Sequence, residues 1–201
     1  MLRLVCIDVD GTLIGESGKP TSGVLDAIIH ARSLGQTLAL STARGAMGPT
    51  ADYASLLNPS GWHIFHAGAS LVHTGSSEII GEALPKDIIR IGTELSGIHG
   101  WALEYYSADD YRSVDDSLAD QPLAAAHSKM LGCDFKVGDA SDLVEPVVRL
   151  QFVVNESQVS EILELMAGKG NVSVATSPVL VGVAFISVTK EGVNKGSAIL
   201  R

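Results

Sequence analysis

Cysteine, basic residues and long apolar runs are scarce in this sequence, and each scarcity excludes a class of protein. Two cysteines among 201 residues are too few for the disulfide framework of a small secreted domain. No apolar run approaches the roughly 18 residues that a membrane helix requires, and Asp8 interrupts the N-terminal apolar stretch that a secretory signal would need. We therefore expect a cytoplasmic protein, without a membrane as partner.

The charge balance excludes further partners. Lysine and arginine total 14 against 23 aspartates and glutamates, so the formal net charge is −9. A surface this acidic repels nucleic acid backbones, and we expect no nucleic acid partner. A small molecule fits better, although a phosphorylated one would need locally placed positive charge. With 46% hydrophobic residues, the chain can bury a sizeable core.

The first 40 residues alternate between strand and helix patterns. Residues 2–7 form an apolar, β-branched-rich run that predicts a buried parallel strand ending at a glycine turn. Residues 24–34 carry apolar side chains at helix spacing. A second apolar strand at residues 37–40 completes a βαβ unit, whose two strands should lie parallel.

The remaining patterns indicate an α/β fold with an insertion. A strand at residues 63–65 and a hairpin across residues 70–80 extend the first part. Strands, helices and longer polar loops then mix from residue 84 to 180, which predicts an inserted α+β domain. We assign residues 1–83 and 181–201 to a Rossmann-like parallel-sheet core and residues 84–180 to the insertion.

Asp8 and Asp10 carry the chemistry that this pattern suggests. Positions i and i+2 of an extended strand project to the same side, so both carboxylates should lie at the carboxyl end of a parallel strand, where open α/β sheets bind ligands. One aspartate could act as a nucleophile, the other could move a proton, and Mg²⁺ would relieve their repulsion. Gly11 would leave its amide facing phosphate oxygens. The alternative is that these acids merely cap a turn, since Asp-Gly is a common turn dipeptide.

The string Asp8-Val9-Asp10-Gly11-Thr12 resembles the first motif of the haloacid dehalogenase-like (HAD) phosphatases, in the Cof-type branch with a type IIB cap. The resemblance implies that Asp8 is the nucleophile and a Mg²⁺ ligand. It also implies that Asp10 is the acid/base and that its backbone carbonyl binds Mg²⁺. The residues between 84 and 180 would then be the cap, and the substrate would be a sugar phosphate or a similar small metabolite.

Two further segments resemble motifs of the same family. In Ser41-Thr42-Ala43-Arg44, Thr42 matches a phosphate-binding hydroxyl, with Ala43 in place of the usual glycine. A turn-capping role for Thr42 is the alternative, and Arg44 fits a substrate clamp and a solvated loop residue equally. Lys195 matches the third motif, where it would neutralise both nucleophile and phosphate. Read alone, Lys195 would be a surface lysine.

The sequence departs from the family pattern at two places. Residues 67–69 resemble an Asn-Gly-Ala turn with alanine replacing asparagine. A fourth motif, which would supply further acidic Mg²⁺ ligands, does not follow Lys195 before Arg201. Residues 138–142 precede Lys195 and have the wrong spacing, so we expect a loop there. We therefore expect either a fragment of a longer protein or a degenerate member of the family.

The predicted reaction is phosphate monoester hydrolysis through an aspartyl phosphate on Asp8. Two alternatives stay open: a phosphomutase sharing the nucleophile, and a binding or regulatory module without catalysis. A zinc site built from His63, His66 and His73 lacks cysteine or carboxylate support, so we expect polar strand and loop residues there. The sequence carries no signal for an oligomeric state.

Overall fold

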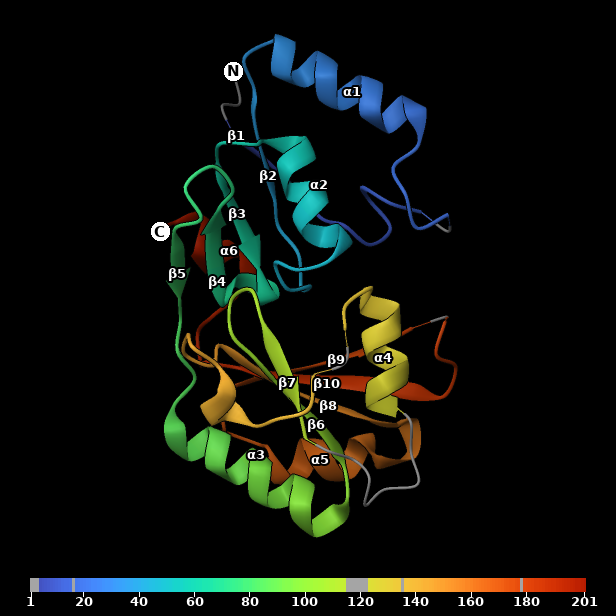
Figure 1. The fold of residues 1–201 in the computed structure, drawn as a ribbon, viewed down its shortest axis with the longest axis vertical. Coiled ribbons are helices and arrows are strands. Elements are labelled where there is room, and N and C mark those ends of the chain that lie inside the picture. Colours follow the sequence, from blue (N-terminus) through green and yellow to red (C-terminus); the bar gives the residue numbers. More distant parts are fainter. Residues whose placement is uncertain (1–3, 16, 115–122, 135, 178) are drawn as a thin grey trace. The chain divides into compact units, whose positions relative to one another are not determined.

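The computed structural model describes residues 4–15, 17–114, 123–134, 136–177 and 179–201, which form two compact units (Figure 1). The core unit runs to Ile80 and includes Asn194–Arg201, whereas the inserted unit is Gly81–Val193. The first boundary lies near the predicted residue 83. The second is displaced from residue 181 to residue 194, which corrects the predicted assignment of the intervening segment to the core.

The core unit is built on a parallel strand–helix–strand arrangement. Its elements are β1 (Leu4–Ile7), α1 (Ser22–Ser33), β2 (Thr37–Leu40), α2 (Pro49–Leu57), β3 (Trp62–Phe65), η1 (His66–Gly68), β4 (Ser70–His73), β5 (Ile79–Gly81) and α6 (Lys195–Ile199). β1 and β2 pair in parallel, which confirms the βαβ prediction. A parallel bridge between Ser41 and Ile64 links β2 to β3, and β3 pairs antiparallel with β4. The strands β4 and β5 are hydrogen-bonded neighbours in this sheet, which confirms the hairpin predicted across residues 70–80.

Strand β1 is less buried than its apolar sequence predicts. Leu4 is exposed, and the next three residues of β1 are only half-buried. The reason is its position in the sheet, because within the described part of the chain β1 pairs with β2 alone. The predicted parallel pairing of this strand is confirmed, whereas its predicted burial is wrong because β1 forms an edge of the described sheet.

Helix α2 has no counterpart in the sequence analysis. Pro49 occupies its first turn, where a missing N–H costs nothing, and Gly48 precedes it with a positive φ of 54°. Ala54 and Leu57 are buried in the apolar cluster of the core unit. Nine residues give too few turns for the apolar spacing to reveal such a helix.

The inserted unit is a five-stranded antiparallel sheet with helices. Its elements are α3 (Lys86–His99), β6 (Ala102–Tyr106), β7 (Tyr111–Ser113), α4 (Leu123–Leu131), η3 (Ala140–Asp142), β8 (Arg149–Asn155), η4 (Glu156–Gln158), α5 (Val159–Leu165), β9 (Asn171–Thr176) and β10 (Val183–Thr189). The strand order is β7-β6-β8-β10-β9. Because β10 is hydrogen-bonded to β8 on one side and β9 on the other, it cannot belong to the core sheet.

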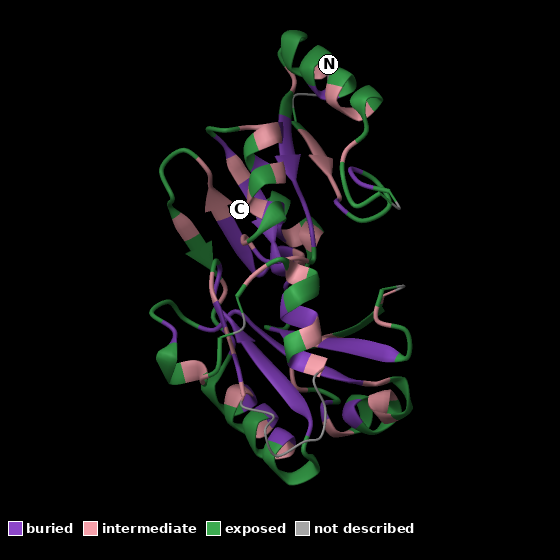
Figure 2. Cartoon of the chain, turned by 45° about the vertical axis from the view of Figure 1, so that its right-hand side comes forward, coloured by how far each residue is buried: buried purple, intermediate pink, exposed green. Residues whose placement is uncertain are grey.

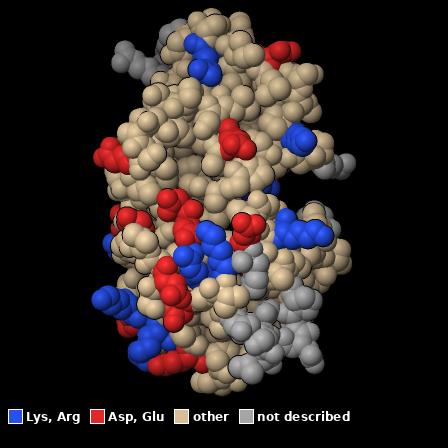
Figure 3. Space-filling view, viewed as in Figure 1, with Lys and Arg blue, Asp and Glu red and all other residues tan. Residues whose placement is uncertain are grey.

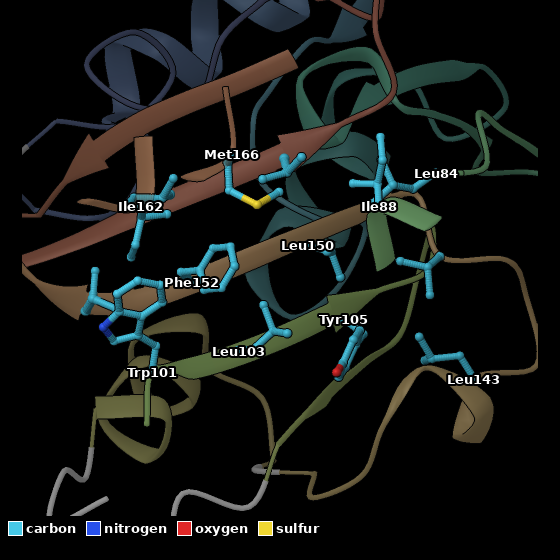
Figure 4. Close-up of a cluster of buried hydrophobic side chains, with 14 residues drawn as sticks. Leu84, Ile88, Trp101, Leu103, Tyr105, Leu143, Leu150, Phe152, Ile162 and Met166 are labelled. Carbon is cyan, nitrogen blue, oxygen red and sulfur yellow. The ribbon is translucent and has the colours of Figure 1, made fainter. Parts of the chain in front are cut away.

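One face of this sheet packs against α3 and α5 through an apolar cluster (Figure 4). Leu103 and Phe152 project from neighbouring strands, and Ile162 of α5 covers them, all fully buried. Figure 2 shows the consequence, with the central strands buried and the outer faces of α3 and α5 exposed. Burial of this face stabilises the unit by roughly 25 cal/mol per Å² of apolar surface removed from water.

The opposite face of the sheet carries a buried polar network around Glu104. Its carboxylate accepts hydrogen bonds from Tyr106 Oη at 2.7 Å and from Gln151 Nε2 at 3.0 Å. His127 of α4 places its Nδ1 2.8 Å from Glu104 Oε1, which attaches the helix to this face. The Arg149 guanidinium stacks over the Tyr106 ring at 4.0 Å, so the buried negative charge lies near a buried positive charge.

We expect the tyrosines of this unit to make its stability fall at alkaline pH. Burial, followed by the nearby negative charge of Glu104, raises the pKa of Tyr111 to about 12, and burial also raises the pKa of Tyr106 well above its ordinary value. The folded state thus holds these phenolic protons more tightly than the unfolded chain, whose tyrosines titrate near 10. The stabilisation is complete below pH 10 and is lost as the pH rises toward 12.

Urea unfolding at a series of alkaline pH values measures this loss, and ultraviolet absorbance of tyrosinate reports the titration itself. The variant Tyr111→Phe should flatten the pH dependence of the unfolding free energy above pH 10. An unchanged slope in that variant would show that Tyr111 titrates normally.

Several remaining sequence predictions can be placed. Helix α4 belongs to the mixed strand and helix pattern predicted between residues 84 and 180, and one polar stretch of that range, Asp115-Asp116, lies outside the described residues. Residues 138–142 form a loop with the short η3, as predicted. None of the helices within the described ranges has the length and apolarity to cross a membrane.

Acidic and basic side chains are interspersed on the face shown in Figure 3.

Candidate functional site

Asp8 and Asp10 follow β1 directly, at its carboxyl end. The chain then coils back, because Leu13 N donates to Asp8 O at 3.1 Å and Ile14 N donates to Val9 O at 3.0 Å. Gly11 adopts a φ of 71°, which a glycine tolerates, and its amide donates to the Ile14 carbonyl at 3.0 Å. The prediction that the Gly11 amide faces phosphate oxygens is therefore wrong, since the turn itself uses that donor.

The carboxylate of Asp8 lies between two donors. Its Oδ1 accepts a hydrogen bond from the Val9 amide at 2.8 Å, and its Oδ2 lies 2.9 Å from the Lys195 ammonium. The side chain nevertheless keeps 44% of its surface exposed. The structure thus brings the predicted nucleophile and the predicted lysine together in a position that a ligand can reach.

The position of Lys195 depends on a close approach of two backbones. Lys195 is the first residue of α6, and the Asn194 side chain caps that helix by accepting from Ser197 N at 2.9 Å. Gly68 lies against this cap, with a φ of 107°, and a Cβ there would overlap the Asn194 carbonyl group. The sequence analysis singled out the turn at residues 67–69, but it predicted neither the approach of Gly68 to α6 nor the cap formed by Asn194.

Asp10 is paired with Arg44. The guanidinium donates from Nε to Asp10 Oδ2 at 3.0 Å and from Nη2 to Asp10 Oδ1 at 2.6 Å, a two-point geometry that fixes both groups. The Asp10 side chain is 63% exposed, so the pair lies at the surface of the core unit. Arg44 is therefore neither a solvated loop residue nor, in this state, a substrate clamp.

Thr42 lies at the end of the same loop and is fully buried. Its hydroxyl oxygen accepts a hydrogen bond from the Arg44 amide at 3.1 Å, while its own backbone amide donates to Ile64 O at 3.0 Å. The hydroxyl proton remains able to donate to another group. Ala43, between them, is exposed. The structure thus bears out the turn contact for Thr42, and a phosphate contact stays a prediction.

The donor set fits Mg²⁺ only in part. Asp8 and Asp10 offer the hard oxygen ligands that this ion prefers. No group of three or more metal-ligating acidic, histidine or cysteine side chains occurs in the ranges that the structure describes. Two acidic residues of the inserted unit are engaged in contacts of their own: Asp110 pairs with Arg112 and Lys136, and Asp139 caps η3.

The histidines that invited a zinc interpretation have other contacts. His63 is buried, and its Nδ1 accepts a hydrogen bond from the Leu40 amide at 2.9 Å. Burial lowers the pKa of His63, so the neutral ring that this contact needs is favoured. His73 contacts Ser76 at 3.0 Å. The expectation of polar strand and loop residues matches these contacts.

Comparison with known proteins agrees with this geometry. A crystal structure of a haloacid dehalogenase-like hydrolase from Bacteroides thetaiotaomicron matches with a TM-score of 0.79 at 18% identity, covering 100% of this chain and 75% of that one. A HAD subclass IIB sugar phosphatase matches with a TM-score of 0.75 at 17% identity, covering 98% of this chain and 73% of the other. At these identities the matches establish the fold.

Sequence comparison gives the family. YxeH, a proposed phosphatase of Bacillus subtilis (strain 168), is 31% identical over 84 residues, which are 41% of this chain and 31% of that protein. The chain thus spans less than a third of the length of this curated relative. The family described as haloacid dehalogenase-like hydrolase matches residues 5–201. Nearly the whole chain is covered by that match, and the protein belongs to the haloacid dehalogenase-like hydrolase family.

Proposed function

We propose that this protein hydrolyses small phosphate monoesters, with Asp8 as the nucleophile. The observation that carries the proposal is the Asp8 carboxylate itself, which is oriented by the Val9 amide, faces the Lys195 ammonium at 2.9 Å and remains half exposed at the end of a parallel strand. Family membership supports the same reaction.

The proposed reaction has two displacement steps. An Asp8 oxygen forms a bond to phosphorus, and the bond from phosphorus to the ester oxygen breaks. Asp10 gives its proton to the departing oxygen and then takes a proton from water, which attacks the aspartyl phosphate and releases inorganic phosphate. Lys195 offsets the negative charge that gathers on the nucleophile and the transferring group.

Asp10 must leave its resting arrangement to do this work. While both of its oxygens accept from Arg44, neither can deliver a proton to a leaving group. A phosphate dianion is an alternative partner for the guanidinium, since the same fork of donors matches phosphate oxygens. In the proposed cycle, substrate binding draws Arg44 to the phosphate and releases Asp10, while the Thr42 hydroxyl donates to the phosphate.

Mg²⁺ is proposed as the cofactor. Asp8 and the backbone carbonyl of Asp10 would hold it, and the ion would supply charge neutralisation on the phosphate. Two protein ligands make a weak site, so we expect the isolated 201-residue chain to bind Mg²⁺ in the millimolar range, on the order of extracellular calcium modules.

The substrate class is proposed from the relatives. One similar structure is that of a sugar phosphatase, and we propose a sugar phosphate or a comparable phosphorylated metabolite here. The inserted unit, as a cap, would select among such substrates through its own side chains. Both cysteines are free, in keeping with a cytoplasmic setting.

Phosphate release from a panel of hexose phosphates and p-nitrophenyl phosphate, with Mg²⁺ and with EDTA, tests the proposal. We expect release that requires Mg²⁺ and falls to background in EDTA. Isomerised hexose phosphate without phosphate release would indicate a phosphomutase. A silent calorimetric titration with Mg²⁺, together with no turnover of any substrate, would indicate a binding module and would refute the proposed hydrolysis by this chain.

A further inference from the structure

The turn that follows β3 has a backbone conformation unusual for its residues. His66 and Ala67 adopt φ values of 50° and 55°, both in the left-handed region, and neither is a glycine. Alanine has no side chain that could favour this conformation locally, so contacts with the surroundings must hold it. The turn lies entirely within the core unit. His66 is not part of the motifs that contain Asp8, Thr42 and Lys195.

Those contacts go to the loop that carries Thr42 and Arg44. The His66 amide donates to the Arg44 carbonyl at 2.9 Å, and the Ala67 amide donates to the Thr42 carbonyl at 2.9 Å. Two successive left-handed residues therefore present consecutive amides to two carbonyls of one loop. An extended backbone would point these amides in opposite directions and could satisfy only one of the two.

The ring of His66 also contacts the loop that carries Thr42 and Arg44. His66 is fully buried, and a Cβ placed on Gly45 would lie 2.8 Å from its Cε1 and 3.1 Å from its Nε2. The imidazole thus rests against the bare backbone of Gly45, the residue after Arg44. The loop is held at the Thr42 carbonyl, the Arg44 carbonyl and the Gly45 Cα, and from this base the Arg44 side chain reaches both oxygens of Asp10.

We propose that His66 is a positioning residue that holds Arg44 where its guanidinium can pair with Asp10. It acts through the 42–45 loop, by the two backbone hydrogen bonds and the ring contact described above. In the proposed phosphatase, on which its catalytic consequence rests, this contact keeps the Arg44 guanidinium beside Asp10, from where it transfers to the phosphate when the substrate binds. Gly45 belongs to the same arrangement, because a Cβ there would lie 2.8 Å from the ring and 2.9 Å from Met47 Cε, so both side chains would be pushed outward.

The variant His66→Asn tests this directly. Asparagine tolerates the left-handed conformation, so the backbone turn is retained while the ring is lost. Nuclear magnetic resonance can follow hydrogen exchange of the Arg44 Nε–H, and the signal is assigned by its loss in Arg44→Lys. We expect this exchange to be about tenfold faster in His66→Asn than in the wild type. Gly45→Ala should produce the same acceleration by pushing the ring away. His63→Asn, a buried histidine of the same region that does not touch Gly45, is the matched control and should leave this exchange unchanged.

The catalytic readout is separate. In an active protein, His66→Asn should lower kcat by about tenfold to a hundredfold, the effect of a small misplacement, and change the pH profile of kcat, whereas KM changes little. In a protein that already carries Arg44→Ala, adding His66→Asn should change neither kcat nor its pH profile any further. Equal Nε–H exchange in wild type and His66→Asn would overturn the proposal. Absent turnover in the wild type would refute the phosphatase function, and the exchange measurement would still decide the role of His66.

Discussion

Replacing Asp8 by asparagine is expected to lower phosphate release at least about a thousandfold, because the amide oxygen is a poor nucleophile toward phosphorus. The substitution keeps the shape of the side chain and removes its negative charge. The lost ion pair with Lys195 is half exposed, so the free energy of unfolding should change by about 1 kcal/mol or less. A loss of turnover without a loss of stability is the signature of a chemical role.

The measurement is steady-state phosphate release in parallel with urea unfolding. Asp52→Asn is a matched control, since Asp52 is an exposed aspartate of the same unit, in the first turn of α2. It should keep full activity. Turnover by Asp8→Asn at the wild-type rate, from protein free of deamidated product, would rule out Asp8 as the nucleophile and leave the ion pair with Lys195 as a structural contact.

The strands β1, β2 and β10 show which parts of the fold can be predicted from the sequence and which cannot. Local patterns predicted the first two correctly, because the strand–helix–strand spacing permits little besides a parallel pair. Residues 181–201 were assigned to the core, and this assignment misplaced β10. The apolar run of β10 suits a buried central strand of either sheet, and only its pairing with β8 and β9 decides between them.

At the site, residue types were predictable and their contacts were not. The Asp8 and Lys195 motifs could be recognised, and the fold brings them to 2.9 Å. The pairing of Arg44 with Asp10 depends on a loop that is held by the turn at His66, and no local pattern encodes that support. For Gly11, the tight turn was predicted correctly, but the hydrogen bond from its amide to the Ile14 carbonyl was not.

The second large effect is expected for Gly68→Ala, which couples the fold of the core unit to the position of Lys195. A Cβ at this position would overlap the Asn194 carbonyl and lie 3.0 Å from the Lys195 nitrogen, and the φ of 107° is unfavourable for alanine. Strain and overpacking together should destabilise the chain by about 3 kcal/mol. Relief of the overlap requires α6 to move, which carries the Lys195 ammonium away from Asp8.

Activity should therefore fall more than the folded fraction does, by about a hundredfold at a temperature where the variant is fully folded. Gly35→Ala separates the two causes, since Gly35 also has a positive φ, of 74°, but a Cβ there meets nothing within 4 Å. That control should lose about 1 kcal/mol of stability and no activity, because only the conformational cost applies. If Gly68→Ala were as active as Gly35→Ala, the close approach of η1 to α6 would not set the position of Lys195. The ammonium would then reach Asp8 through the flexibility of its own side chain.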